Sequence, residues 1–156
     1  MARDVVDRDR GYRKFARNMQ RFAKGPNVTV GVQGTQAAET RKFGETNAAI
    51  AAIHEFGSID GRIPQRSFIR APMDRERALI NRMLEVAVRS TARDGNARKH
   101  LGIVGARARA EMVRTIDQSI GLAPLAAATV ARKRSSRPLI DTGQLKASLT
   151  WKVHDG

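Results

Sequence analysis

The sequence predicts an α+β fold: a small antiparallel sheet packed against two long helices, with extended loops or arms. Apolar residues recur at helical spacing over two long stretches, Leu79–Val88 and Leu101–Ile120. Short alternating segments lie near the two ends of the chain, around Val30 and Trp151, and strands there could pair beneath the helices. A chain of 156 residues has the size of one domain, so we treat residues 1–156 as a single domain.

The first predicted element is an amphipathic helix from Gly11 to Lys24, which Gly25 and Pro26 end. Its apolar face comprises Tyr12, Phe15, Ala16, Met19, Phe22 and Ala23. The other side is a cationic stripe made of Arg13, Lys14, Arg17, Arg21 and Lys24. Such a stripe suits an acidic partner, but it is equally typical of an ordinary solvated helix face.

A strand and a loop should follow this helix. Residues 27–33 alternate valine with small or polar residues, which predicts a half-buried strand with its valines inward. Residues 35–46 are polar and have no clear period, so we expect a loop there. The alternation makes residues 27–33 the first strand of the predicted sheet.

A short helix is predicted from Asn47 to Phe56, with Asn47 as its N-cap and Gly57 as its stop. Residues 57–72 then contain glycines and prolines without a helical pattern. Loops of this kind often carry function, and we expect this segment, the first arm, to reach a neighbouring subunit. Deleting its residues 61–70 should then leave the monomer folded but stop assembly.

The two long helices should form an antiparallel hairpin. Pro72 suits the first turn of a helix, because its missing N–H costs nothing there. Asp94-Gly95-Asn96 breaks the pattern between the helices, and Gly121 ends the second one.

The last part of the chain is predicted to be an irregular excursion followed by a strand. Residues 122–141, the second arm, contain two prolines and a short alanine-rich piece, with room for one helical turn. Asp141 or Thr142 could then cap a helix start. Residues 148–153 alternate as a closing strand. The sheet would thus have few strands and exposed edges, which invite pairing between subunits.

Charge and composition limit the partners. Lysine and arginine number 29 against 15 acidic residues, a formal net charge of +14. This excess favours an anionic partner, which could be nucleic acid, an acidic protein or an anionic membrane surface. No stretch approaches the roughly 18 apolar residues of a membrane span, and the N-terminus has no apolar signal segment. Because the chain has no such segment, we expect no membrane partner. Cysteine is absent, so we expect a protein made in a reducing cytoplasm.

A search for catalytic motifs predicts no enzyme, no cofactor and no metal. His54-Glu55 opens the zinc-protease motif, but position 58 is serine where that motif needs its second histidine. Thr142-Gly143 lies in no nucleophile elbow, and Gly102 and Gly105 precede no phosphate-binding Lys-Ser or Lys-Thr. The first helix, the hairpin and residues 132–137 are strongly basic instead.

Contact with a nucleic-acid backbone needs only cations. The residues expected to contact DNA or another acidic partner are Arg13, Arg17, Arg21, Lys24, Arg132, Lys133 and Arg134. The single Tyr and the single Trp both occupy apparent core positions, so the aromatic platforms of single-strand binders are missing. Sequence-specific recognition is therefore not expected.

Two segments resemble a known family. Ala52-Ile53-His54-Glu55-Phe56-Gly57, followed by Ile63-Pro64-Gln65-Arg66-Ser67-Phe68-Ile69-Arg70, resembles the tail-component family of lambdoid phages, which is related to minor tail protein Z. After Ala128-Thr129-Val130-Ala131-Arg132-Lys133, the segment Pro138-Leu139-Ile140-Asp141-Thr142-Gly143-Gln144-Leu145-Lys146-Ala147-Ser148 resembles the same group and the Mu-type virion-morphogenesis family. Ser67 departs from the proline more usual in the family, which affects only the stiffness expected of the first arm.

The resemblance implies a structural virion protein, a tail-completion or head–tail-joining (neck) subunit that forms a homo-oligomeric ring, often sixfold. Its partners would be other copies of itself, neighbouring neck and tail-tube proteins, and genomic DNA passing through the channel. The residues expected at the intersubunit arms are Ile63, Pro64, Arg66, Phe68, Ile69, Leu139 and Thr142. For Phe68 and Ile69, ordinary packing on their own domain is an alternative of equal weight. The alternative is a basic DNA-binding accessory protein that works on its own.

Overall fold

Two strands from opposite ends of the chain form the sheet. The computed structural model describes residues 11–41, 44–132, 137–140 and 142–155. In it, β1 (Asn27–Val32) pairs antiparallel with β2 (Leu149–His154), and the register sets Val30 opposite Trp151. The predicted pairing of the two ends of the chain is confirmed, and with it the α+β fold.

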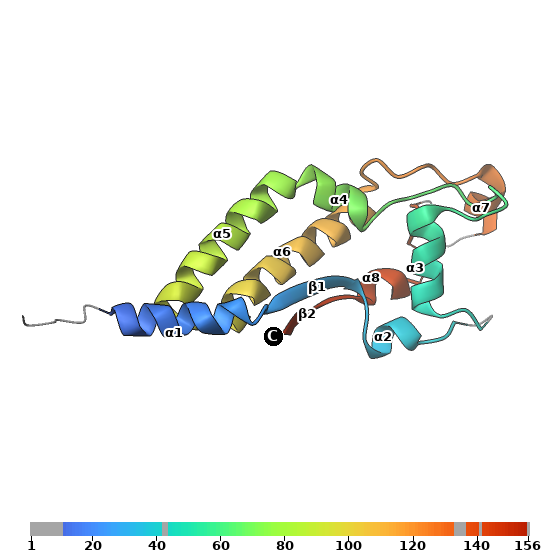
Figure 1. Ribbon diagram of the computed structural model, residues 1–156. Coiled ribbons are helices and arrows are strands. Elements are labelled where there is room, and N and C mark those ends of the chain that lie inside the picture. Colours follow the sequence, from blue (N-terminus) through green and yellow to red (C-terminus); the bar gives the residue numbers. More distant parts are fainter. Residues whose placement is uncertain (1–10, 42–43, 133–136, 141, 156) are drawn as a thin grey trace, which may run out of the picture.

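The long helices α5 (Arg77–Asp94) and α6 (Ala97–Gln118) form the predicted hairpin (Figure 1). Gly95 ends α5 at a positive φ of 80°, and the side chain of Asn96 caps α6 by accepting a hydrogen bond from the amide of Lys99. Of these two helices, α6 packs on both strands of the sheet, while α5 packs on α6. The layers are therefore sheet, α6 and α5, in that order.

Glycines allow α6 to approach the sheet closely. A Cβ on Gly105 would lie 2.7 Å from Cγ2 of Val28, and one on Gly102 would lie 3.2 Å from the ring of Trp151. Arg109 of α6 also donates to the carbonyl of Leu149 on β2, at 2.7 Å. Trp151 lies over the glycines but stays 38% exposed, so the expectation that it belongs to the core is wrong.

A short helix, α4 (Arg70–Arg75), precedes α5, so the helix predicted from Pro72 is interrupted. Glu76 separates the two with φ −93° and ψ 9°. Arg75 of α4 donates to the hydroxyl of Thr115 on α6, at 3.0 Å, which fixes α4 against α6. The sequence pattern runs through this junction because both helices bury one side against α6.

Helix α1 (Tyr12–Ala23) forms as predicted, but its apolar face is only partly covered, since Ala16, Met19 and Phe22 are half-buried. Tyr12 is 75% exposed and Phe15 is 50% exposed. The helix packs on α5 through the buried Asn18, whose amide donates to the carbonyl of Ala92 at 3.0 Å. The expected core position of the single tyrosine is therefore wrong, because packing on α5 leaves Tyr12 at the start of the helix uncovered.

Two helices occupy the region between β1 and the first arm. The stretch expected to be a loop contains a short helix, α2 (Thr35–Ala38), and is followed by α3 (Asn47–Phe56). The N-cap of α3 is Thr46, whose hydroxyl accepts from the amide of Ala49, rather than the predicted Asn47. Asn47 is buried instead, and its amide donates to the carbonyl of Gln36, which joins α2 to α3.

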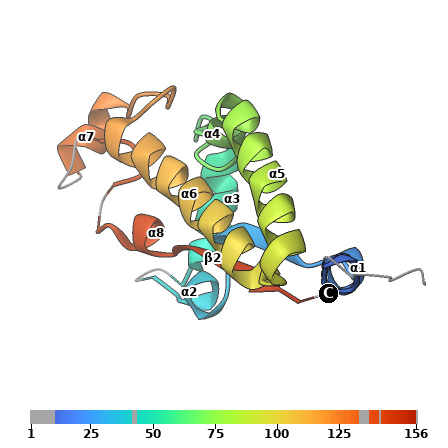
Figure 2. The same cartoon turned by 90° about the vertical axis from the view of Figure 1, so that its left-hand side faces the viewer.

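Helices α7 (Ala127–Arg132) and α8 (Gln144–Ala147) complete the chain. The N-cap of α8 is Gly143 rather than the predicted Thr142. The hydroxyl of Thr142 lies 3.5 Å from the amide of Gln144, one residue before that cap. Asp141, the other predicted cap, lies outside the described residues. Figures 1 and 2 both place α7 and α1 at opposite ends of the molecule.

Candidate intersubunit surface

The first arm is anchored by one buried carboxylate. Glu55, in the last turn of α3, is 5% exposed and accepts four hydrogen bonds. They come from the hydroxyl of Ser67 at 2.6 Å, and from the amides of Phe68 at 2.9 Å and of Ile69 and Arg70 at 3.0 Å. A carboxylate that accepts hydrogen bonds from three backbone amides at a chain turn stabilises that turn. The glutamate of the His-Glu pair thus holds the arm at the start of α4.

A buried arginine connects the two arms. Arg66 is 5% exposed, and its guanidinium donates to the carbonyl of Ala123 at 2.7 Å and to that of Pro124 at 2.9 Å. Its amide also donates to the carbonyl of His54 at 2.7 Å. Burial lowers the pKa of the Arg66 guanidinium, which nevertheless stays protonated because arginine titrates so far above neutrality. The two arms therefore meet at Arg66, within one protomer.

Two residues expected at a subunit contact belong to the protomer's own core. Phe68 is fully buried, and it and Leu139 lie in the same cluster as Met112, Ile116 and Leu149. Phe68 therefore packs on its own domain, the alternative left open for it, and Leu139 exposes only 7% of its surface, at the groove between the arms, so its assignment to a subunit contact is corrected. The expectation that residues 61–70 can be deleted without unfolding the monomer is also contradicted, because the deletion would remove Phe68 and Arg66.

The other predicted arm residues occupy three different places. Ile63 and Pro64 line a groove of about 630 Å³ between the arms, together with Arg66 and Leu139. Its opposite wall is formed by Pro124, Leu125, Ala126 and Thr129. Ile69 lies apart, in a pocket with α3 and the end of β1, and Thr142 is exposed before α8. The structure thus brings both arms into one surface without bringing all seven residues together.

A tight turn in the first arm presents an apolar side chain that the sequence reading missed. In this Ile59 turn (residues 58–63), the hydroxyl of Ser58 donates to Asp60 at 2.6 Å and accepts from the amide of Ile63 at 2.8 Å. The amide of Arg62 donates to the same Asp60 oxygen at 3.1 Å. The Ser58 hydroxyl and the Arg62 amide hold the pKa of Asp60 below its ordinary value. Ile59, at the tip, is fully exposed.

Of the two exposed apolar residues in this region, the sequence could have predicted the exposure of one. Ile59 stands between Ser58 and Asp60-Gly61, all typical turn residues, so its exposure follows from turn chemistry. Phe56 gives no such signal, because it ends a helix whose residue pattern suits burial, yet it is 70% exposed. Both residues lie within or beside the segment of the His-Glu-Phe-Gly motif.

The predicted cationic residues do not form one surface. Arg13, Arg17, Arg21 and Lys24 are all exposed on α1. Arg132 ends α7, at the opposite end of the molecule (Figures 1 and 2). Lys133 and Arg134 lie outside the described residues. The arginines of the hairpin are partly engaged, because Arg107 pairs with the buried Glu111 at 2.7 Å and Arg89 lies 3.9 Å from Glu85.

Neither a metal-ligand cluster nor a membrane-spanning helix occurs among residues 11–155 wherever the structure describes them. No cluster of three or more histidine or acidic side chains there could hold a metal ion. None of the described helices combines the length and the apolar character needed to cross a bilayer. The sequence matches no protein-family model, and no curated protein or solved structure shows detectable similarity to it.

Proposed function

We propose that this protein is a structural subunit of a tailed-phage virion, which completes the tail or joins it to the head as part of a homo-oligomeric ring. The observation that carries the proposal is that the polar residues of the first resembling segment are hydrogen-bonded within the fold. These residues serve folding, since Glu55 fixes the first arm and Arg66 links it to the second. On the outside, the first motif leaves the apolar side chains of Ile53 and Phe56 exposed, beside the polar Gln65 and Arg70.

A ring subunit needs surfaces that a single copy leaves unsatisfied. Phe56 and Ile59 are exposed at one end of the chain's fold, and Val86 and Ile103 are exposed on the hairpin. Exposed apolar residues gathered in patches mark interaction sites more often than scattered ones do. The protein would act by assembly in the neck or tail of the virion, with adjoining neck and tail-tube proteins as further partners.

The oligomeric state tests this proposal. Size-exclusion chromatography with light scattering should give a mass several times the 17.2 kDa of one chain, and electron microscopy of the same fraction should show closed rings. A protein that remains monomeric at every concentration up to its solubility limit would contradict the ring.

The alternative, a DNA-binding accessory protein, is favoured by one observation. Arg17, Arg21 and Lys24 project from α1 and form no ion pair with any other described residue. The combined change Arg17→Ala, Arg21→Ala should then weaken binding to duplex DNA and reduce the slope of log affinity against log salt by about two. Tight, salt-dependent DNA binding by a monomer would favour this alternative over the ring.

A further inference from the structure

The exposed side of α1 carries a regular row of cations. Arg13, Arg17, Arg21 and the C-cap residue Lys24 follow one another at intervals of four, four and three residues. They therefore lie on one side of the helix, roughly 5 to 6 Å apart along its axis. All four are exposed, whereas the helix packs on α5 through the buried Asn18. A row of this kind suits a partner whose negative charges also repeat at regular intervals.

The row leads into a cleft between the end of α1 and the turn of the hairpin (Figure 1). Arg21 and Lys24 line this cleft, which measures about 450 Å³, from α1. Arg98, in the first turn of α6, lines it from the hairpin. Cations from two distant parts of the chain thus meet at one place. The row and the cleft together define the cationic surface: Arg13, Arg17, Arg21, Lys24 and Arg98.

Two acidic side chains also line the cleft, but each already has a partner. Asp94 accepts hydrogen bonds from the amide of Asn96 and from His100, both at 2.8 Å. Asp155 lies 4.0 Å from Arg98 and is 74% exposed, and so long an ion pair in water contributes little. Three cations line the cleft against these two acids, so an anion there would meet more positive than negative charge.

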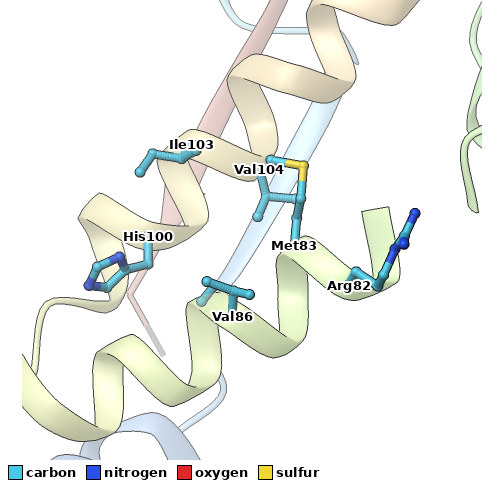
Figure 3. A pocket seen from close by; sticks show the side chains of 7 residues that line it. Arg82, Met83, Val86, His100, Ile103 and Val104 are labelled. Carbon is cyan, nitrogen blue, oxygen red and sulfur yellow. The ribbon is translucent and has the colours of Figure 1, made fainter. Parts of the chain in front are cut away.

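The hollow between the two helices of the hairpin has a different character. Figure 3 shows Met83 and Val86 of α5 and Ile103 and Val104 of α6 lining it, with Arg82 pointing away from them. These side chains are apolar and offer no row of cations. A polyanion is therefore better accommodated by the cationic surface than by this hollow.

Nucleic acid suits the cationic surface better than a bilayer does. A helix that lies in a bilayer surface needs an uncovered apolar side. On α1 that side is partly covered, because Ala16, Met19 and Phe22 are half-buried, which leaves Tyr12 and Phe15 as its large exposed side chains. The phosphate backbone of a nucleic acid needs cations alone, and its charges repeat regularly along the strand.

The position of the aromatic rings favours a duplex over a single strand. Proteins hold single strands largely through aromatic side chains on which the bases stack. The exposed rings of Tyr12 and Phe15 lie on the apolar side of α1, away from the row of cations. Bases of a strand that followed the row would find no ring to stack on, whereas a duplex keeps its bases stacked on one another.

We infer that the cationic surface binds the phosphate backbone of duplex DNA without reading its sequence. Helix α1 lies along the backbone, and the cleft receives a phosphate between Lys24 and Arg98. Binding at this site rests on the DNA-binding role proposed above as the alternative function, and it specifies which residues make the contact. The same contact would serve a ring whose channel is lined by this surface.

A double variant, Lys24→Ala with Arg98→Ala, removes one cation from each side of the cleft. Fluorescence anisotropy with a short labelled DNA duplex should show affinity lower by roughly 10-fold at moderate salt, and a slope of log affinity against log salt smaller by about two. Both side chains are exposed, so the far-UV circular dichroism spectrum should stay that of the wild type.

The matched control removes the same charge elsewhere. Arg62→Ala with Arg77→Ala changes arginines that are 87% and 71% exposed, in the first arm and at the far end of α5. Because charges farther away than the screening length contribute little, this control should change the affinity by less than about twofold.

A second pair of variants should change the affinity in the opposite direction. Asp155→Asn removes the acidic partner of Arg98, so duplex binding should tighten by roughly 2- to 5-fold. Asp74→Asn removes the same charge at the start of the hairpin, where Asp74 pairs with Arg77 at 2.7 Å, and should leave the affinity unchanged.

The outcomes separate this site from the functions proposed above. If the wild type binds the duplex but the Lys24, Arg98 variant and its control lose affinity equally, the site is overturned and DNA binding remains. A wild type that binds no duplex at low salt, or that co-sediments with anionic vesicles instead, overturns both the site and the alternative function. Light scattering of the same samples reports on the ring independently. Selective loss in the cleft variant, with tighter binding by Asp155→Asn, supports the site.

Discussion

Glu55 shows how one residue can appear catalytic in the sequence and prove structural in the fold. It follows His54, a pairing typical of metal-dependent hydrolases, but its carboxylate is consumed by Ser67 and three backbone amides. Sequence reasoning could reject the zinc motif because the second histidine is missing. It could not find the actual role, because the partners are 12 to 15 residues away and meet Glu55 only through the path of the arm.

Glu55→Ala should lower the free energy of unfolding by about 3 kcal/mol, because it leaves one buried and two part-buried amides without an acceptor. The control is Glu85→Ala on α5, an exposed carboxylate, which should change that free energy by less than about 0.5 kcal/mol. Urea denaturation followed by circular dichroism measures both. Equal stability of the two variants would show that Glu55 does not anchor the arm.

Asp94, at the turn of the hairpin, should make stability depend on acid pH. It accepts from the amide of Asn96 and from His100, both at 2.8 Å, and these bonds hold the pKa of Asp94 below its ordinary value. A carboxyl whose pKa is lower in the folded state stabilises the fold above its unfolded pKa of about 4, and this contribution is lost as pH falls through the folded value.

Urea midpoints of the wild type and of Asp94→Asn should therefore differ at about pH 6 and converge as the pH falls below the folded-state pKa of Asp94, where neither chain carries the charge. The asparagine keeps an acceptor oxygen but cannot titrate. A difference of the same size above and below that pKa would mean that the charge of Asp94 does not contribute.

At the scale of elements, periodicity predicted the strands and the long helices well, and it failed on what covers them. Both strands and the hairpin form where the patterns place them, because each buries one regular face. Helix α1 forms too, yet Tyr12 and Phe15 stay exposed. A pattern reports which side of a helix is apolar, but the neighbour that could cover it is decided by the whole fold.

The packing of α6 on the sheet makes a contrast between two glycines of one helix. Gly105→Ala should destabilise the protein by about 1–3 kcal/mol, because its Cβ would lie 2.7 Å from Val28 and 3.1 Å from Cβ of Trp151. The Cβ added by Gly102→Ala would meet only the ring of Trp151, at 3.2 Å, and Trp151 is partly exposed to solvent. The ring can shift outward, so the higher helix propensity of alanine should leave stability unchanged or raise it by up to about 1 kcal/mol.

Thermal and urea unfolding of the two glycine variants check this contrast, with each variant compared with the wild type under the same conditions. The expectation fails if Gly102→Ala is the more damaging of the two. That result would mean that the Trp151 ring, and not the backbone approach near Val28, limits how closely α6 can lie on the sheet.

At the scale of the whole molecule, the two arms are one structure rather than two free extensions. Sequence reasoning recognised both as irregular segments and could not see that they join, because Arg66 contacts a carbonyl 57 residues away. It assigned Leu139 to the outside and left Phe68 undecided between a subunit contact and its own domain, because the arms lack a core-like period. A single buried side chain in a loop leaves no periodic signal, so such core residues are the hardest to predict.

The joined arms should loosen together when their link is cut. Arg66→Ala removes both donors to the second arm and leaves the carbonyls of Ala123 and Pro124 without their partner. Amide hydrogen exchange should then speed up in residues 58–69 and in residues 122–132 alike. The amides of those α6 residues that pack on the sheet should stay protected. Arg62→Ala, which changes an 87% exposed arginine of the same arm, should leave both segments as they are. Faster exchange confined to residues 58–69 would mean that the second arm is held in place without Arg66, and that the two arms can move independently of each other.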